Sequence, residues 1–290
     1  MTNKHLADLL SKESIHHYRN KVLVIKYGGS IMENSSAITS FIEDLVFLRS
    51  HGIKPVIVHG GGKEISRRLS LLNIESQFLD GYRVTTEEAI DEIEMVLKGK
   101  VNNQLITALA KYKIDAVGLS GKDMSLIEVN KKLSHTSGKD YGYVGDIKRI
   151  NSDILTLLIN NNTIPVIAPI GHCDQFKTYN INADDVASAI SASLKAEALV
   201  LMTDVNGLYL NFEDPNSLIN SCDLTYLETL IHHETLTGAI LPKVLSCINA
   251  IKDGVKSCHV INGSTKHSIL LKLFSKEHFG TSISKEGHYE

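Results

Sequence analysis

The amino-acid sequence predicts an α/β protein built around a large, mainly parallel sheet. Short apolar runs recur along the chain, and they are nearly continuous rather than alternating with polar residues. Continuous runs of this kind are typical of strands that a parallel sheet buries on both faces. Amphipathic helical patterns separate the runs, and the alternation of the two indicates α/β architecture.

The elements can be placed in order along the chain. The predicted strands span residues 21–27, 54–60, 115–121, 164–171, 198–205 and 256–263. The predicted helices span residues 38–50, 64–72, 86–111, 152–161, 184–195, 243–252 and 266–274. Thr85 and Glu88 have the spacing of a capping box, which predicts the start of the long helix.

Two segments depart from this alternation. Residues 125–132 and 142–150 alternate apolar with polar side chains, which predicts a hairpin with one solvated face. Ahead of the first strand, apolar side chains recur at helical spacing at Leu6, Leu9, Leu10 and Tyr18. This N-terminal helix would pack on its own domain or against another subunit, and the spacing favours neither.

The composition is that of an ordinary globular protein and excludes several other classes. The chain has 290 residues, enough for a large core and two lobes, with 43% hydrophobic and 22% charged residues. A formal net charge of -3 without a basic stripe argues against general nucleic-acid binding. No apolar run approaches membrane-spanning length, and the first residues lack the apolar core of a signal peptide. The four cysteines form no CxxC pair and are typical of reduced thiols, so a cytoplasmic location is expected.

Glycine-containing turns follow the first two predicted strands. The first strand ends in Lys26, close before Gly28 and Gly29, and a buried lysine is costly unless it meets an opposite charge. The second strand ends in Gly60, Gly61 and Gly62. Backbone N–H groups at a helix start bind anions, although a tight turn alone would also explain the glycines. Because parallel strands end at the same edge of a sheet, both turns together predict a phosphate or carboxylate site there.

Polar side chains gather at three further points. Lys243 stands at a predicted helix start, where the helix dipole disfavours a cation unless an anion is bound. Arg83 follows a glycine, and arginine is suited to a bidentate grip on a carboxylate. A solvated lysine and a surface ion pair are the respective alternatives. The start of another helix carries more polar groups than a cap needs, at Asn180, Asn182, Asp184 and Asp185.

Two common nucleotide-binding motifs are missing from the sequence. The order GxxxxGK[ST] does not occur, and Lys26 precedes its glycines rather than following them. GxGxxG also occurs nowhere, which disfavours a nucleotide-binding dehydrogenase. If phosphate is bound, another architecture binds it.

Ten motifs in a fixed order carry a resemblance to a known family. They are "KYGG", "VHGGG", "GYRVT", "AVGLSGKD", "YVGDI", "IPVIAPIG", "YNINADD", "LMTDVNGL", "LPKV" and "GTSI". With them the chain resembles the N-acetylglutamate kinases of the amino acid kinase family, over about residues 21–283. The resemblance implies an open αβα sandwich with an N-terminal helix in residues 1–20. It also implies an amino-acid-binding lobe in residues 21–197 and a nucleotide-binding lobe in residues 198–290.

The resemblance also implies roles for individual residues. Lys26 and Lys243 would flank the transferring phosphoryl group, and Asp184 would hold both lysines in place. The phosphate-binding residues would be Gly28, Gly29 and Gly60. The residues that bind the amino acid would be Gly61, Gly62, Arg83 and Asn180, under a lid that includes residues 139–146. The nucleotide-binding residues would be Thr203, Asp204, Val205, Asn206, Gly207, Leu208 and Tyr209.

The function implied is ATP-dependent phosphorylation of the side-chain carboxylate of N-acetyl-L-glutamate, the second step of arginine biosynthesis. ATP would be the cofactor, with Mg²⁺ carried by its phosphates rather than by a protein metal site. The alternatives are a related kinase for aspartate or an aminoadipate-type acid, and a non-catalytic regulatory homologue. "YNINADD" with "GYRVT" favours N-acetylglutamate, and the presence of both lysines with Asp184 disfavours a non-catalytic protein.

The resemblance leaves assembly and regulation less defined. The N-terminal extension is similar to that of arginine-inhibited members, so a homo-oligomer is expected, either a dimer or dimers joined into a hexamer. Those members carry a glutamate and a glycine where this chain has Lys272 and His278. A lysine would repel the guanidinium of arginine, so weak or absent feedback is expected. The sequence does not decide on control by a PII protein, or between a cytoplasmic and a plastid location.

Overall fold

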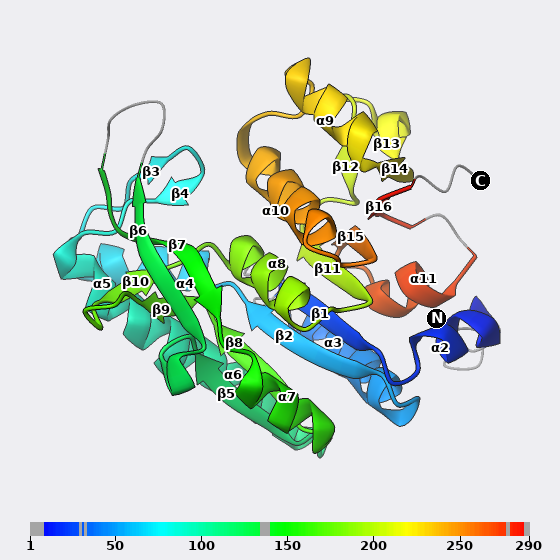
Figure 1. The fold of residues 1–290 in the computed structure, drawn as a ribbon, viewed down its shortest axis with the longest axis horizontal. Coiled ribbons are helices and arrows are strands. Elements are labelled where there is room, and N and C mark those ends of the chain that lie inside the picture. Colours follow the sequence, from blue (N-terminus) through cyan, green and yellow to red (C-terminus); the bar gives the residue numbers. More distant parts are fainter. Residues whose placement is uncertain (1–8, 29–30, 32–33, 134–139, 277–278, 287–290) are drawn as a thin grey trace.

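A computed structural model describes residues 9–28, 31, 34–133, 140–276 and 279–286 (Figure 1). Its centre is an eight-stranded sheet with the order β14-β16-β15-β11-β1-β2-β8-β5. The strands are β1 (Val22–Tyr27), β2 (Lys54–His59), β5 (Ala116–Ser120), β8 (Ile164–Ala168), β11 (Ala198–Thr203), β14 (Ser221–Asp223), β15 (Ser257–Asn262) and β16 (Thr281–Ser284). Only the β15–β16 pair is antiparallel, so the predicted mainly parallel sheet is confirmed.

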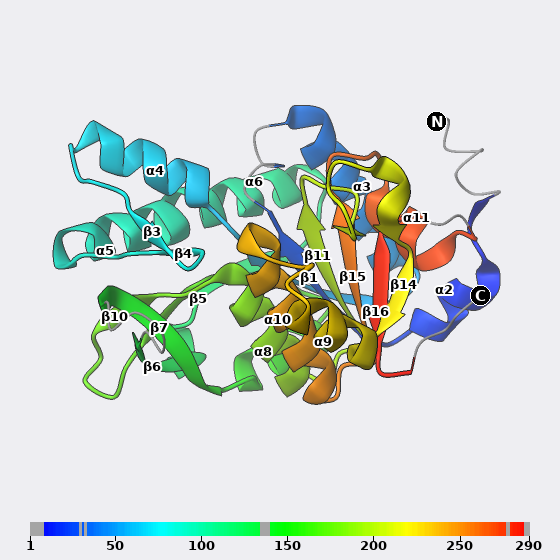
Figure 2. The same cartoon turned by 90° about the horizontal axis from the view of Figure 1, so that it is seen from above.

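Helices cover both faces of this sheet, which confirms the αβα sandwich. Figure 2 shows α3 (Ser35–Ser50), α6 (Asn103–Lys111) and α11 (Ser268–Phe274) on one face. On the other face lie α8 (Ala183–Ser193), α9 (Leu224–His232) and α10 (Leu241–Lys252). The core cluster on that second face also includes apolar residues of α7 (Asp153–Asn160). A smaller cluster joins α4 (Gly62–Leu71) to α5 (Glu87–Glu94).

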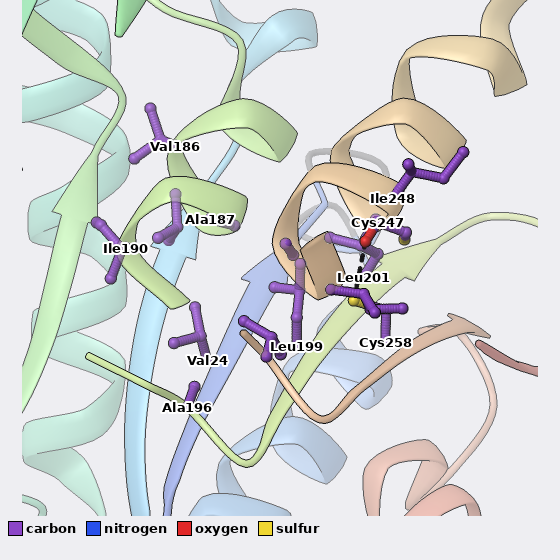
Figure 3. Close-up of a cluster of buried hydrophobic side chains, with 14 of the residues drawn as sticks. Val24, Val186, Ala187, Ile190, Ala196, Leu199, Leu201, Cys247, Ile248 and Cys258 are labelled. Atoms are coloured by element: carbon purple, nitrogen blue, oxygen red, sulfur yellow. Dashed lines mark hydrogen bonds between the residues drawn. The ribbon is translucent and has the colours of Figure 1, made fainter. Parts of the chain in front are cut away.

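The central strands β1, β2, β8, β11 and β15 are largely apolar because each of them contributes to two cores. On β1, Val24 belongs to the cluster under α8 and α10, whereas Leu23 and Ile25 belong to the cluster under α3 and α11. Figure 3 shows side chains of α8 and α10 packed onto Val24, Leu199, Leu201 and Cys258. Burial on both faces therefore explains the continuous apolar runs in the sequence.

A second, four-stranded sheet closes into a small barrel beside the central sheet. It consists of β6 (Ile127–Leu133), β7 (Asp140–Ile150), β9 (Ile170–His172) and β10 (Thr178–Asn180). β6 and β7 pair antiparallel, which confirms the predicted hairpin. The predicted strand 164–171 is split between the two sheets, because β8 ends before Pro169 and β9 begins after it. Short strand pairs are β3 (Phe78–Leu79) with β4 (Tyr82–Arg83), and β12 (Leu208–Tyr209) with β13 (Leu218–Ile219).

The predicted long helix 86–111 is not a single regular helix. A π-helix, Met95–Asn102, separates α5 from α6. The N-terminal cap of α5 also differs from the prediction, because Thr86 rather than Thr85 accepts the hydrogen bond from the N–H of Ala89. Thr85 is fully buried and donates its hydroxyl to the carbonyl of Arg83. Short 3₁₀ turns complete the fold at Asp123–Ser125, Pro215–Ser217 and Gly238–Ile240.

The N-terminal segment packs within the chain itself. Leu6 lies outside the described residues, and the helix α2 spans only Lys12–Tyr18, after the cap Ser11. Leu10 forms an antiparallel bridge with Ser275 instead of continuing the helix. Tyr18 is buried against the ring of Phe274, with the ring centroids 5.6 Å apart. Across the described part of the chain, no helix has the length and apolar character needed to cross a membrane.

Candidate active site

The two glycine turns lie side by side at the carboxyl edge of the sheet. β1 and β2 are parallel neighbours, with Tyr27 opposite His59, and the N–H of Gly60 donates to the carbonyl of Tyr27 at 2.9 Å. A Cβ atom added to Gly28 would lie 2.7 Å from the carbonyl oxygen of Met202. A side chain is therefore excluded there, while Gly29 lies outside the described residues. The shared edge predicted for the turns is confirmed.

The turn after β2 leads directly into α4, whose first residue is Gly62. The first N–H groups of a helix have no partner within the helix, so this end of α4 can bind an anion. A Cβ atom added to Gly61 would lie 2.5 Å from Cδ2 of Leu97, which belongs to the π-helix. A side chain at Gly61 would therefore require the buried side chain of Leu97 to shift.

Lys26, Asp184 and Lys243 form one charged cluster beside these turns. Lys26 Nζ lies 2.9 Å from Oδ1 of Asp184, and Lys243 Nζ donates to Oδ2 at 2.9 Å. The lysines come from the end of β1 and the first turn of α10. The predicted meeting of these three residues is thus present, and it answers why a lysine ends a core strand.

Asp184 is held as a carboxylate within this cluster. Its side chain is only 4% exposed, and burial by itself would raise its pKa. The charges of Lys26 and Lys243 outweigh burial and lower the pKa of Asp184 to about 2. Oδ1 of Asn182 caps α8 by accepting a hydrogen bond from the N–H of Asp184 at 2.7 Å. This bond fixes the backbone that carries the carboxylate. The cluster of one anion with two cations leaves a net positive charge for a bound anion.

A cavity of about 570 Å³ opens next to the second glycine turn. Gly61, Gly62, Arg83 and Asn180 all line it, so the structure brings the four predicted acid-binding residues together. Gly60 lines the same cavity, as does Val144 of the predicted lid. Lys139 of that lid lies outside the described residues.

Arg83 is a buried cation without an acidic partner among the residues that the structure describes. Its guanidinium donates to the carbonyl of Gly62 at 2.9 Å and to Oγ of Ser66 at 2.8 Å, and it also contacts Ser76. Cζ of Arg83 lies over the ring of Phe78, 4.6 Å from the ring centroid. Burial lowers the pKa of Arg83 from its usual value, and no carboxylate among the described residues pairs with it. A buried and uncompensated guanidinium at a cavity wall is suited to a carboxylate ligand.

A second cavity, of about 380 Å³, lies at the end of β11. Five of the seven predicted nucleotide-binding residues line it: Thr203, Asp204, Val205, Gly207 and Tyr209. Lys243 lines it as well, so the charged cluster adjoins this cavity. Asn206 and Leu208 do not line it, because Asn206 accepts a bond from Asn262 and the side chain of Leu208 lies in the core. The apolar wall that the sequence did not suggest includes Leu210, Phe212 and Ile240.

His59 and Asn102 support the second glycine turn, and sequence reasoning missed both. Nδ1 of His59 lies 2.8 Å from the carbonyl oxygen of Gly60, and its Nε2 lies 3.1 Å from Nδ2 of Asn102. Burial lowers the pKa of His59 to about 4, so the ring is neutral at pH 7. Asn102 also donates to the carbonyl of Val166 and belongs to the π-helix. The signal in the sequence was the histidine before the glycines, but its partner is distant in the chain.

Other features of the described chain lie away from this site. A cavity of about 800 Å³ is at the opposite edge of the sheet, near the start of β2. It is lined by basic side chains, but α3 and α7 end there and point their carbonyl dipoles toward it. No group of three or more His, Cys, Asp or Glu residues within the described ranges could hold a metal ion.

Lys272, one of the two positions singled out for feedback, lies in α11. It is largely buried, and burial lowers its pKa to about 8. Its Nζ donates to the carbonyl of Gly280 at 3.3 Å. His278, the other position, lies outside the described residues, so the expected weak feedback stays a prediction.

Comparisons with known proteins place the chain in a family. The sequence pattern of the amino acid kinase family matches residues 21–262. Acetylglutamate kinase from Caldanaerobacter subterraneus subsp. tengcongensis is 44% identical over 94% of this chain and 90% of its own length. Acetylglutamate kinase from Clostridium acetobutylicum is 44% identical over 96% of this chain and 94% of its own.

Solved structures show the same fold at low sequence identity. N-acetylglutamate synthase from Neisseria gonorrhoeae, complexed with coenzyme A and N-acetyl-glutamate, superposes with a TM-score of 0.85 at 24% identity. The similarity covers 99% of this chain but 64% of that longer one. Carbamate kinase from Giardia lamblia bound to AMP-PNP gives a TM-score of 0.68 at 16% identity, over 92% of this chain and 99% of that one. With the family pattern and the identity to its relatives, these findings show that the chain belongs to the acetylglutamate kinases of the amino acid kinase family.

Proposed function

We propose that this chain transfers the γ-phosphoryl group of ATP to the side-chain carboxylate of N-acetyl-L-glutamate, a step of arginine biosynthesis. The observation that carries the proposal is the Lys26–Asp184–Lys243 cluster, which adjoins the 380 Å³ cavity through Lys243 and stands at the strand edge where the glycine turns begin. Arg83, without an acidic partner in the described chain, adds a carboxylate-binding group in the 570 Å³ cavity.

The acid would occupy the larger of these two cavities. Arg83 would bind its α-carboxylate, and Asn180 and the backbone at Gly61 and Gly62 would bind its other polar groups. A glutamate side chain has a reference pKa of about 4.3, so the attacking carboxylate is already ionised at neutral pH. The enzyme therefore needs no general base, and catalysis reduces to alignment and charge neutralisation.

The reaction joins two anions, which explains why two lysines are required. A carboxylate oxygen attacks the γ-phosphorus while the bond to the leaving β-phosphate oxygen breaks, so the products are an acyl phosphate and ADP. Lys26 and Lys243 would neutralise the charge that develops on the transferring group. Gly28 and Gly29 would place backbone N–H groups around the phosphates. Gly60 would shape the turn instead of donating to a phosphate, because its N–H already donates to the carbonyl of Tyr27. When bound with ATP, Mg²⁺ would supply further neutralisation of the β- and γ-phosphates.

The adenine nucleotide would bind along Thr203, Asp204, Val205, Gly207 and Tyr209. With this placement, the acid lobe would comprise residues 21–197 and the nucleotide lobe residues 198–290. Asn206 and Leu208 would shape the nucleotide loop from outside the cavity, because the N–H of Leu208 donates to Oγ1 of Thr281 at 2.8 Å. The four cysteines are free thiols, which suits a reducing compartment such as the cytoplasm.

The first test is a panel of acids with ATP and Mg²⁺, using N-acetylglutamate, glutamate, aspartate and aminoadipate. Hydroxylamine traps any acyl phosphate as a hydroxamate, and ADP release is followed in parallel. We expect both signals with N-acetylglutamate only. Turnover with a different acid would replace the substrate but keep the kinase, whereas silence with all four would favour a non-catalytic homologue. The Lys243→Ala variant is the control for a contaminating kinase, because its signal should vanish.

A further inference from the structure

The hairpin that carries Arg83 touches the helix that carries Lys243. The turn between β3 and β4 contains Gly81, and a Cβ atom added there would lie 3.1 Å from Cγ of Pro242. Pro242 immediately precedes Lys243 in the first turn of α10. Figure 2 shows the β3–β4 turn beside the start of α10. The elements that carry Arg83, which is proposed to bind the acid, and Lys243, which is proposed to bind the phosphoryl group, are therefore in direct contact.

Asp185 connects the same two elements through its two oxygens. Oγ of Ser246, on α10, donates to Oδ1 of Asp185 at 2.8 Å. The hydroxyl of Tyr82, on β4, donates to Oδ2 of Asp185 at 3.4 Å. Oγ of Ser246 also lies 2.9 Å from the carbonyl of Pro242, but a carboxylate is the stronger acceptor for its single proton. Asp185 thus links Tyr82, which is adjacent to Arg83 in the chain, to the helix that carries Lys243.

We infer that Asp185 is a positioning residue, which holds the hairpin of Arg83 and the helix of Lys243 at the separation that phosphoryl transfer needs. The inference rests on the proposed function and adds a residue to it. Asp185 is not the carboxylate that pairs with the two lysines, because Asp184 pairs with both. It does not cap α8 either, because Asn182 accepts the N–H of Asp184.

Other neighbours reinforce the hairpin on its far side. The hydroxyl of Tyr141 donates to Asp80 in the same turn at 2.7 Å, and the rings of Tyr82 and Tyr141 are 5.9 Å apart. Nζ of Lys132 lies 4.4 Å from the centre of the Tyr82 ring. These contacts all join the hairpin to the small sheet. Only the contact of Gly81 with Pro242 and the bond from the Tyr82 hydroxyl to Asp185, among the contacts described here, face α10 and Asp185. Loss of Asp185 should therefore loosen that side of the hairpin alone.

Kinetics of two Asp185 variants test the inference. Asp185→Ala removes both bonds, and we expect kcat to fall by between about tenfold and a hundredfold because the reacting groups lose alignment. KM for N-acetylglutamate should rise as well, while KM for ATP stays within about threefold. Asp185→Asn keeps the shape and can bond to both hydroxyls, so it should restore most of the rate. A purely structural role would lower the active fraction and kcat but leave both KM values unchanged.

The connection through Asp185 also predicts a pattern among double variants. Tyr82→Phe and Ser246→Ala should each reduce kcat/KM for the acid by about threefold to tenfold, in line with one hydrogen bond each. Both effects should disappear in the Asp185→Ala background, because the carboxylate is their common partner. Ser191→Ala is the matched control, since the hydroxyl of that buried serine on α8 donates to the carbonyl of Ser188 rather than to Asp185. Effects that add fully to that of Asp185→Ala would overturn the inference.

A measurement without turnover separates this inference from the proposed function. Hydrogen exchange of the wild type and of Asp185→Ala reports the protection of the amides in residues 78–83. We expect faster exchange in this hairpin in the variant, with no change around Tyr143 and Glu87. If no acid of the panel is turned over but the hairpin loosens, the proposed reaction fails and the connection stands. Unchanged exchange together with unchanged KM values would overturn the connection itself.

Discussion

At the scale of single residues, the site is organised by charges that lack a balanced partner. Asp184 meets two lysines, and Arg83 meets no acid within the described residues. Buried charges are stable only when they are paired or ready to bind an opposite charge. Both excess cations are therefore best explained by an anionic acid and an anionic nucleotide that bind together.

The two lysines should be individually indispensable for catalysis. Lys26→Ala or Lys243→Ala should lower kcat by roughly a hundred- to a thousandfold, the typical effect of removing one transition-state stabiliser. Either variant leaves Asp184 with one lysine, so the fold should persist. Turnover and circular dichroism measure the two effects. Lys252→Ala is the matched control, because this lysine lies on α10 too but pairs with Glu228 at the surface. A variant with normal turnover would exclude that lysine from the mechanism.

Arg83 should determine the affinity for the acid. Arg83→Lys keeps the charge but loses the bidentate geometry, so KM for N-acetylglutamate should rise by about ten- to a hundredfold. KM for ATP should not change, because Arg83 does not line the nucleotide cavity. Initial rates at varied acid and fixed ATP give the answer. Arg67→Lys, an exposed position on α4, is the control. An equal rise in both KM values would contradict the assignment.

At the scale of elements, strand ends and helix starts decide where chemistry occurs. β1 and β2 bring two glycine turns to one edge because they are parallel and adjacent. The π-helix between α5 and α6 brings Leu97 against Gly61 and places Asn102 under His59. An irregular helix thus supports the glycine turn on which the proposed anion site depends.

His259, on β15, should make the stability of the fold depend on pH. Burial is the main cause that lowers the pKa of His259 to about 3, so the folded protein keeps the ring neutral. The unfolded chain binds a proton near pH 6.5, so stability is lost as pH falls below that value. Between pH 7 and pH 4, the free energy of unfolding should fall by about 3 kcal/mol from this group.

Urea unfolding of the wild type and of His259→Asn at several pH values measures this contribution. Between pH 7 and pH 4, the free energy of unfolding of the wild type should fall by about 3 kcal/mol more than that of His259→Asn. His232→Asn, at the exposed end of α9, is the control substitution. Parallel curves for the wild type and His259→Asn would show that His259 does not carry this pH dependence.

At the scale of the whole molecule, the N-terminal segment is fixed to the end of α11. Tyr18 packs on Phe274, and the N–H of Ser11 donates to the carbonyl of Phe274 at 2.7 Å. One side of the N-terminal helix therefore packs on its own domain. The expected homo-oligomer stays a prediction, which sedimentation of the purified protein would test.

Tyr18 should contribute to the stability of the whole chain. Tyr18→Ala removes a buried ring, so the free energy of unfolding should fall by about 3 to 5 kcal/mol. Tyr18→Phe keeps the ring and should cost far less. Urea unfolding of both variants measures the difference. If Tyr18→Ala is as stable as the wild type, the contact with Phe274 does not hold the segment in place.

Most of the fold could be predicted from local patterns. The apolar strands, the hairpin and the order of helices follow from periodicity, which is a property of neighbouring residues. The errors lie where long-range contacts override it. Thr85 is drawn into the buried contact with Arg83, so Thr86 caps the helix instead. The strand at 164–171 divides because its two ends pair with different sheets.

The sequence by itself determined which residue types stand at the strand ends and, through ordered motifs, the family to which they belong. Only the tertiary structure decided which of them meet. Lys26 and Lys243 converge on Asp184, Arg83 has no acid beside it in the described part of the chain, and Asp185 reaches both Tyr82 and Ser246. The physical reason is that helix and strand patterns are local, whereas the pairing of charges depends on strand order and on which helices cover each face of the sheet.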